Sequence, residues 1–180
     1  MRLSIGDFAP AFEVEDIFGK PIRLQDYRGK KLLLSFYRYA SCPLCNLRVQ
    51  ELIQRYSLYE EKGLYVLAFF QSPVESIRRY VGKQDAPFPI IADPQRDIYK
   101  RYGVESSVLG TVVAGFEWNP RMRAAHKAGY NYGKMEGNIL LVPADFLIGE
   151  GLTIETAFYG KDIGDHMPFE TIEAYLESGE

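Results

Sequence analysis

The chain has 180 residues, of which 47% are hydrophobic and 25% charged, and its formal net charge at pH 7 is −3. These values are typical of one globular domain, which we expect to span residues 1–180 and to bury a sizeable core. The small net charge and the lack of a Lys/Arg run argue against nucleic acid or an anionic membrane as a partner. Because we find no signal-peptide pattern and no apolar stretch of bilayer length, we expect a cytoplasmic protein.

The sequence predicts a small N-terminal hairpin and five further strands. Residues 12–17 alternate apolar and acidic side chains and precede a turn at residues 18–21, which predicts an N-terminal β-hairpin. Continuous apolar runs predict buried strands at residues 31–37, 64–70 and 88–92. Two further strands are predicted at residues 139–148 and 154–159. They are close enough in sequence to pair antiparallel, so the sheet should be mixed.

Helices are predicted between these strands. Apolar side chains from residue 45 to residue 59 recur at spacings of three and four, which indicates an amphipathic helix that ends at Gly63. Ser72, Pro73 and Glu75 predict the start of the next helix, with an N-cap serine and a capping-box glutamate. Further helices are predicted to begin at residues 93–94, to run from 119 to 129, and to begin at Pro168. Strands that alternate with helices indicate an α/β fold.

The two cysteines of the chain form a C-x-x-C motif, Cys42-Pro43-Leu44-Cys45, where a predicted strand gives way to a predicted helix. In a cytosolic-type protein this arrangement indicates a thiol–disulfide redox site. Cysteines at i and i+3 in the first turn of a helix can close a small disulfide. The unpaired amides and the positive dipole end of the helix stabilise a thiolate, which is the reactive species.

Three other interpretations of the cysteine pair remain open. A structural disulfide would close a loop too short to add much stability. A zinc site needs four ligands, and the two histidines, His126 and His166, are not at ligand spacing. The third alternative is an inert pair. Because Cys45 lies on the core-facing stripe of its helix and Cys42 at the helix start, we expect Cys42 to be exposed and to attack, and Cys45 to resolve.

Several segments resemble the peroxiredoxins of the alkyl hydroperoxide reductase C / thiol-specific antioxidant (redoxin) superfamily. The opening of the chain, residues 5–12 and 26–30, is similar to the superfamily's Gly-Asp, Ala-Pro and Arg-Gly-Lys pattern. Residues 87–93 with 102–104 resemble its Pro-Phe-Pro and Tyr-Gly-Val segment, and residues 143–148 resemble its Pro-to-Phe-Leu-Ile strand. The resemblance implies a thioredoxin-like fold with a central mixed β-sheet flanked by helices, and it leaves an insertion at about 105–137.

The site departs from the peroxiredoxin pattern, in which a Pro and a Thr stand seven and three residues before the peroxidatic cysteine. Counting back from Cys42 gives Ser35 and Tyr39, and counting back from Cys45 gives Arg38 and Cys42. Pro143 stands where peroxiredoxins place an arginine. It resembles instead the cis-proline that faces the redox cysteines of thioredoxin-like proteins, so we expect a cis Val142–Pro143 bond. The site therefore resembles a thioredoxin-like dithiol in a peroxiredoxin-like body.

The resemblance implies an antioxidant thiol oxidoreductase with Cys42, Cys45, Arg38 and Pro143 at its site. Thiol–disulfide exchange is the leading hypothesis, a thiol peroxidase acting on hydrogen peroxide or organic hydroperoxides is the alternative, and a non-enzymatic redox sensor is a third. We expect no metal or organic cofactor, and a thioredoxin- or glutathione-type electron donor. The substrate would be a peroxide or an oxidised thiol. Superfamily members often associate, which also implies a homodimer.

Other residues are weaker candidates. Arg38 and Arg48 flank the cysteines, where either could lower a thiolate pKa or bind a peroxide oxygen, or could simply be solvated. A general-base role for His126 is less expected than an ordinary structural one, and His166 should help to cap the final helix. The aromatic residues Phe116, Trp118, Tyr130 and Tyr132 could line a pocket or a dimer contact, or pack in the core.

Overall fold

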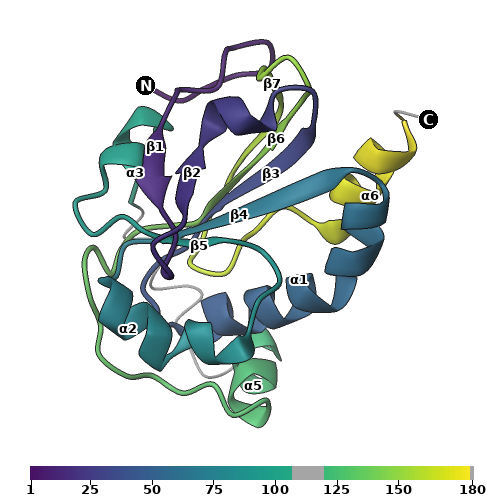
Figure 1. Cartoon of the computed structure of the whole chain (residues 1–180). Helices are drawn as coiled ribbons and strands as arrows, with labels where there is room; N and C mark the ends of the chain where they lie inside the picture. The colour runs from purple at the N-terminus through teal and green to yellow at the C-terminus, as the bar shows by residue number, and fades with distance from the viewer. Residues whose placement is uncertain (107–119, 179–180) are drawn as a thin grey trace.

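A five-stranded mixed sheet forms the centre of the computed structural model, which describes residues 1–106 and 120–178 (Figure 1). Its order is β5-β4-β3-β6-β7, in which β3 pairs parallel with β4 and antiparallel with β6. The pairs β4–β5 and β6–β7 are parallel and antiparallel, respectively. The strands are β3 (Lys31–Phe36), β4 (Leu64–Phe70), β5 (Ile90–Ala92), β6 (Ala144–Ile148) and β7 (Ile154–Tyr159). The predicted mixed α/β sheet is confirmed.

Helices and the N-terminal hairpin cover the two faces of this sheet. One face packs against α1 (Pro43–Glu61), α2 (Val74–Arg79), α5 (Pro120–Lys127) and α6 (Phe169–Glu177). The other face packs against α3 (Asp97–Arg101), β2 (Pro21–Arg23) and the 3₁₀ helix η1 (Leu24–Tyr27). The antiparallel pair of β1 (Glu13–Glu15) and β2 is the expected N-terminal hairpin. A second 3₁₀ helix, η2 (Val81–Gln84), follows α2.

The apolar run of β4 shows how the sequence builds two cores. Val66, Ala68 and Phe70 pack with the α1 side, whereas the alternate residues Leu67 and Phe69 pack with the α3 side. Side chains of a strand point alternately to opposite faces, so a strand covered on both sides must be apolar throughout. The strand that carries the cysteine loop, β3, is buried in the same way.

The long helix α1 begins and ends where the sequence predicts. Pro43 occupies its first turn, where the missing backbone N–H costs nothing. Gly63, with φ +77°, follows its C-terminal end. The predicted stripe of apolar residues is buried from Cys45 to Tyr59. The helix therefore holds the C-x-x-C motif at its N-terminus against the sheet.

Two predicted helix starts are wrong in detail. Ser72 does not cap α2, whose N-cap is Pro73 and has no side-chain cap bond, because the fully buried hydroxyl of Ser72 accepts a hydrogen bond from the amide of Ala40 instead. The helix predicted from residue 93 begins at Asp97, since Arg96 adopts a left-handed conformation with φ +58°. The Asp93 carboxylate accepts hydrogen bonds from the amides of the first turn of α3.

The strand predicted at residues 139–148 begins only at Ala144. Leu140 and Leu141 close a local turn by donating to Asn138, which takes these residues out of the sheet ladder. Part of the expected insertion at 105–137 lies outside the described residues, including Phe116 and Trp118. Within its described part, α5 matches the helix predicted from 119 to 129.

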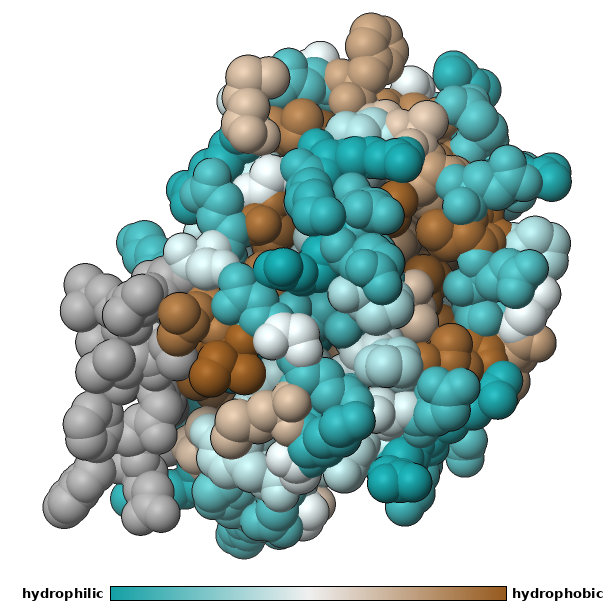
Figure 2. All heavy atoms as spheres, turned by 90° about the vertical axis from the view of Figure 1, so that its left-hand side faces the viewer, coloured by the Kyte–Doolittle hydropathy of each residue, from teal (hydrophilic) through white to brown (hydrophobic). Residues whose placement is uncertain are grey.

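The surface seen from the left of Figure 1 is mostly hydrophilic, and its hydrophobic side chains emerge in separate groups (Figure 2). Among the residues that the structure describes, none of the helices is both long and apolar enough to span a bilayer.

Candidate active site

The C-x-x-C motif lies where β3 leads through a short loop into α1. Cys42 is the N-cap residue of α1, and its carbonyl accepts the first helical hydrogen bond, from the amide of Asn46 at 3.0 Å. Both cysteines are free thiols, and both are only 1% exposed. The expectation of an exposed Cys42 is therefore wrong, because a distant segment of the chain covers the helix start.

That covering segment comprises residues 130–141, which run irregularly from the end of α5 toward β6. Ser41 donates to the carbonyl of Lys134 at 2.8 Å. Gln71 bonds both the amide and the carbonyl of Asn138, each at 2.8 Å. Glu136 accepts a bond from Ser76 at 2.7 Å. Apart from an isolated β-bridge between Leu141 and Ser106, these contacts join side chains to the segment one at a time rather than through a strand ladder. Residues 130–141 can therefore detach without breaking the central sheet.

Arg38 links the covering segment to Cys42. Its Nη1 donates to the Cys42 sulfur at 3.5 Å, and its Nη2 donates to the carbonyl of Ile139. The guanidinium lies 5.0 Å from the ring centre of Tyr39, and Arg38 is only 3% exposed. A fixed positive charge in so dry a place favours an anion on the neighbouring sulfur.

The two cysteines have opposite pKa shifts. Burial raises the pKa of Cys42, but the hydrogen bond from the Cys45 thiol and the charge of Arg38 outweigh it and lower the pKa to about 6. The pKa of Cys45 is raised by burial, by its hydrogen bond to Cys42 and by the nearby negative charge of that sulfur. At neutral pH, Cys42 is therefore the thiolate and Cys45 the protonated thiol.

Hydrogen bonds fix the shape of the cysteine loop. The side-chain amide of Asn46 donates to the carbonyls of Ala40 and Cys42 at 2.8 and 2.9 Å. The amide of Ala40 donates in turn to Ser72 at 2.9 Å. Sequence reasoning missed Asn46. A polar asparagine directly after Cys45, among the apolar residues of the first turn, is the signal that could have identified it.

Pro143 precedes β6, one residue beyond the pairing of Phe36 with Ala144. It is buried at the end of the sheet from which the cysteine loop starts. The expected cis bond is wrong, since the Val142–Pro143 peptide is trans. The trans form is the more stable one for an X–Pro bond, and here the flanking backbone is already paired: Val142 donates to Glu105 at 3.2 Å, and Pro143 accepts from Gly160 at 2.9 Å.

Arg48 and the two histidines serve other contacts. Arg48 donates to the carbonyl of Met167 at 2.6 Å, and its guanidinium lies 3.6 Å from the ring centre of Phe169. His126 is on α5, with its ring centre 6.2 Å from that of Tyr132. The expected capping role of His166 is wrong, because α6 has no side-chain cap bond and His166 is buried against Asp145.

Asp145 is a buried carboxylate that sequence reasoning missed. It accepts hydrogen bonds from Ser35 at 2.6 Å, from the Met167 amide at 2.7 Å and from His166 Nδ1 at 3.0 Å. Burial raises the pKa of Asp145, but its interactions with His166 lower it below its ordinary value. A charged residue inside the apolar strand at 144–148 was the available signal. The cluster joins β3, which carries the cysteine loop, to the segment before α6.

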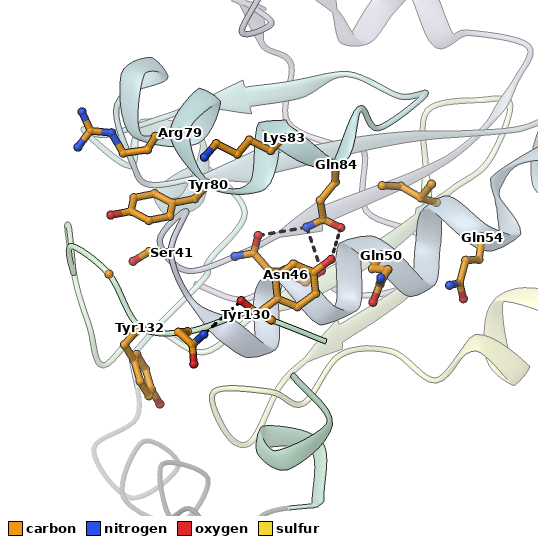
Figure 3. A pocket seen from close by; sticks show the side chains of 14 residues that line it. Ser41, Asn46, Gln50, Gln54, Arg79, Tyr80, Lys83, Gln84, Tyr130 and Tyr132 are labelled. Atoms are coloured by element: carbon orange, nitrogen blue, oxygen red, sulfur yellow. Dashed lines mark hydrogen bonds between the residues drawn. The ribbon is translucent and has the colours of Figure 1, made fainter. Parts of the chain in front are cut away.

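A groove of about 810 Å³ opens beside the cysteine loop, between α1, the end of α2 and residues 129–133 (Figure 3). Ser41, which precedes Cys42 in the chain, and Asn46, which follows Cys45, lie at its wall. Tyr130 and Tyr132 also line it, which agrees with one of the expected alternatives for these aromatic residues and not with the default of core packing.

A thiolate at a helix start, a protonated partner thiol one turn on, and a sheet of this topology define a thioredoxin-fold thiol oxidoreductase. The sequence profile of the AhpC/TSA family matches residues 5–155. The chain belongs to the AhpC/TSA family.

Known relatives carry two kinds of name. A protein of Mycobacterium tuberculosis (strain H37Rv), provisionally named a peroxiredoxin, is 31% identical over 116 residues, 63% of this chain and 74% of its own length. The thiol-disulfide oxidoreductase ResA of Bacillus thuringiensis is 33% identical over 104 residues, 57% of this chain and 60% of its own length. A thiol-dependent redox function is common to both names.

Solved structures share the fold at low sequence identity. The peroxidoxin BcpB of Mycobacterium tuberculosis has a TM-score of 0.72 and 17% identity, with 99% of each chain covered. A PrxQ variant of Xylella fastidiosa has a TM-score of 0.73 and 17% identity, covering 100% of this chain and 99% of its own. The thioredoxin-like fold is thereby confirmed, and the chain is a thiol-dependent oxidoreductase.

Proposed function

We propose that the protein catalyses thiol–disulfide exchange, with Cys42 as the attacking thiolate and Cys45 as the resolving thiol. The observation that carries the proposal is the opposite pKa shift of the two cysteines, to about 6 for Cys42 and upward for Cys45. An attacking thiol must be ionised at neutral pH, whereas a resolving thiol need ionise only once the first sulfur is occupied. Arg38 would then hold the Cys42 thiolate, and Pro143 would border the substrate at the sheet end.

The cycle balances without a cofactor. Cys42 attacks one sulfur of the substrate disulfide, whose S–S bond breaks to release one thiolate and leave a mixed disulfide on Cys42. Cys45 then loses its proton and attacks the Cys42 sulfur, which releases the second thiol and leaves a Cys42–Cys45 disulfide. Two electrons pass to the substrate, and a thioredoxin- or glutathione-type donor would restore the dithiol. The cytoplasmic location and the homodimer stay predictions.

A thiol peroxidase is the second candidate, supported by family membership and by Arg38. The Nε atom of Arg38 is buried without a hydrogen-bond partner among the described residues, so it is free to donate to a peroxide oxygen next to Cys42. The Cys42 thiolate would attack that oxygen and become a sulfenic acid as the O–O bond breaks, and the second oxygen would take up a proton and leave as water or an alcohol. Condensation with Cys45 would then form the disulfide and release water.

Stopped-flow kinetics of the reduced protein separate the two activities. The rates with hydrogen peroxide and with a neutral small disulfide are each compared with those of a free thiol corrected to the same pKa. If the protein catalyses exchange, it should react faster than the free thiol with the disulfide but not with peroxide. A faster reaction with peroxide alone would replace our proposal with the peroxidase. A faster reaction with neither compound would support a non-enzymatic sensor. Cys45→Ser is the matched control, since it retains the first step and loses the second.

A further inference from the structure

The groove beside the cysteine loop has the size and position of a ligand site. Its volume of about 810 Å³ lies within the usual range of roughly 300–1,000 Å³ for small-molecule pockets. Ser41, the residue before Cys42, is among the lining residues. Tyr132 also lines the groove, and the negative charge of Cys42 adds to the burial that raises the pKa of this tyrosine. A molecule held in the groove would therefore lie beside the loop that carries Cys42.

The α1 wall of the groove is built from amide side chains. Asn46, Gln50 and Gln54 follow one another at four-residue spacing, which places them in a row along one face of the helix (Figure 3). With a rise of 1.5 Å per residue, this row extends about 12 Å from the cysteine end of α1. Gln84 closes the row from above by donating to Asn46 Oδ1 at 3.1 Å. The Asn46 amide is already bonded within the protein. Gln50 and Gln54 are therefore the amides of the row that a ligand can use, and primary amides both donate and accept, as peptide groups do.

The opposite wall carries positive charge. Arg79 and Lys83 line the groove, both are exposed, and no Asp or Glu is among the described residues that line it. This local excess of cations contrasts with the net charge of −3 of the whole chain. Two cations without an acid in the described lining favour an anionic ligand and disfavour a cationic one.

We propose that this groove binds a small, carboxylate-bearing disulfide with peptide bonds, and that this ligand class is the substrate of the Cys42–Cys45 pair. The inference rests on the proposed exchange reaction and adds its substrate class. With this substrate a thioredoxin-type donor restores the dithiol, because a glutathione-type donor would only regenerate the substrate. The carboxylates lie near Arg79 and Lys83, the peptide groups along the amide row, and the disulfide beside Ser41. Tyr132 and Gly133 belong to both the groove and the covering segment, so the ligand touches the part of the chain that must move to uncover Cys42.

The test compares three probes that share a disulfide and differ in charge: oxidised glutathione, which is an anionic peptide, bis(2-hydroxyethyl) disulfide, which is neutral, and cystamine, which is cationic. For each probe, the rate with the reduced protein is divided by the rate with free dithiothreitol. This ratio should be highest for the anionic probe. The double variant Arg79→Gln/Lys83→Gln should lose roughly tenfold in rate with oxidised glutathione and less than about twofold with the neutral probe, as expected for two partly solvated ion pairs.

Arg123→Gln is the matched control, because Arg123 is an exposed cation on the nearby helix α5 but outside the groove. It should leave all three rates unchanged. Rising salt should slow only the anionic probe in the unaltered protein, which tests the charge argument without any substitution. If the double variant keeps its preference for the anionic probe, the groove proposal is wrong while the exchange reaction stands. If none of the three disulfides reacts faster than with a free thiol, the proposed function itself fails.

Discussion

Replacing Arg38 with methionine should change the pH dependence of Cys42 reactivity far more than its rate at neutral pH. The substitution removes the positive charge and the 3.5 Å hydrogen bond from the Cys42 sulfur, while the burial that raises the pKa remains. A hydrogen bond to a charged group contributes about 1.5–3 kcal/mol, or roughly one to two pH units in a pKa. The pKa of Cys42 should therefore rise from about 6 to roughly 7.5.

Two effects then oppose each other. At pH 7 the thiolate fraction falls from roughly 90% to about 25%, but a more basic thiolate is also a better nucleophile, with a Brønsted coefficient of about 0.4–0.5. The gain per thiolate is about fivefold, so the rates of the two proteins should cross near neutral pH. Below about pH 6 the variant should be roughly fivefold slower, and above about pH 8.5 roughly fivefold faster.

The assay is alkylation of Cys42 by iodoacetamide across this pH range, in a Cys45→Ser background that leaves one thiol and keeps a hydroxyl donor at position 45. Arg38→Lys is the matched control. It retains the charge and should keep the low pKa, although it loses the two-armed bond to Cys42 and Ile139. If the apparent pKa of Cys42 is the same in the Arg38→Met variant as in the protein that keeps Arg38, the role of Arg38 in forming the thiolate is refuted.

Three further predictions concern the surroundings of the thiol. Asp145→Asn removes a buried carboxylate that accepts hydrogen bonds from Ser35, His166 and the Met167 amide, and should lower the free energy of unfolding by about 3 kcal/mol in urea at pH 7. Because the pKa of Asp145 is lowered in the fold, its contribution exists above about pH 4 and is lost as the pH falls further, so an undiminished difference at pH 3 would contradict the assignment. Gln71→Ala removes both bonds to Asn138 and should speed alkylation of Cys42 at least about fivefold by freeing the covering segment, whereas an unchanged rate would show that opening lies elsewhere. His126→Gln should leave the exchange rate within about twofold, since His126 contacts Tyr132 rather than a sulfur, and a larger loss would restore the general-base hypothesis.

Local sequence signals predicted most of the elements because the forces behind them are local. The stripe from Cys45 to Tyr59 marks a helix that buries one face, and Pro43 and Gly63 mark its ends. The apolar run at 64–70 coincides with β4 at both ends. In such segments, burial and backbone geometry demand the same residues, so the pattern and the structure agree.

Long-range hydrogen bonds explain what the sequence did not reveal. Ser72 looks like a helix cap, yet its hydroxyl serves Ala40, which lies 32 positions earlier in the chain. Cys42 looks exposed at a helix start, yet residues 130–141 cover it, and Arg38 reaches Ile139 across 101 positions. A local sequence pattern does not indicate hydrogen-bond partners that lie far away in the chain. It did place Cys42, Cys45 and Arg38 together, because all three lie on one short loop and the first turn of α1.

The most direct test of the roles of the two cysteines is to trap the intermediate and identify its sulfur. Reduced Cys45→Ser and Cys42→Ser variants are each mixed with a small disulfide, and the products are mapped by mass spectrometry of peptides. We predict that Cys45→Ser accumulates a stable mixed disulfide on Cys42, and that Cys42→Ser reacts no faster than a buried, protonated thiol. A mixed disulfide that forms rapidly on Cys45 in the Cys42→Ser variant, with none on Cys42 in the other, would contradict the assignment.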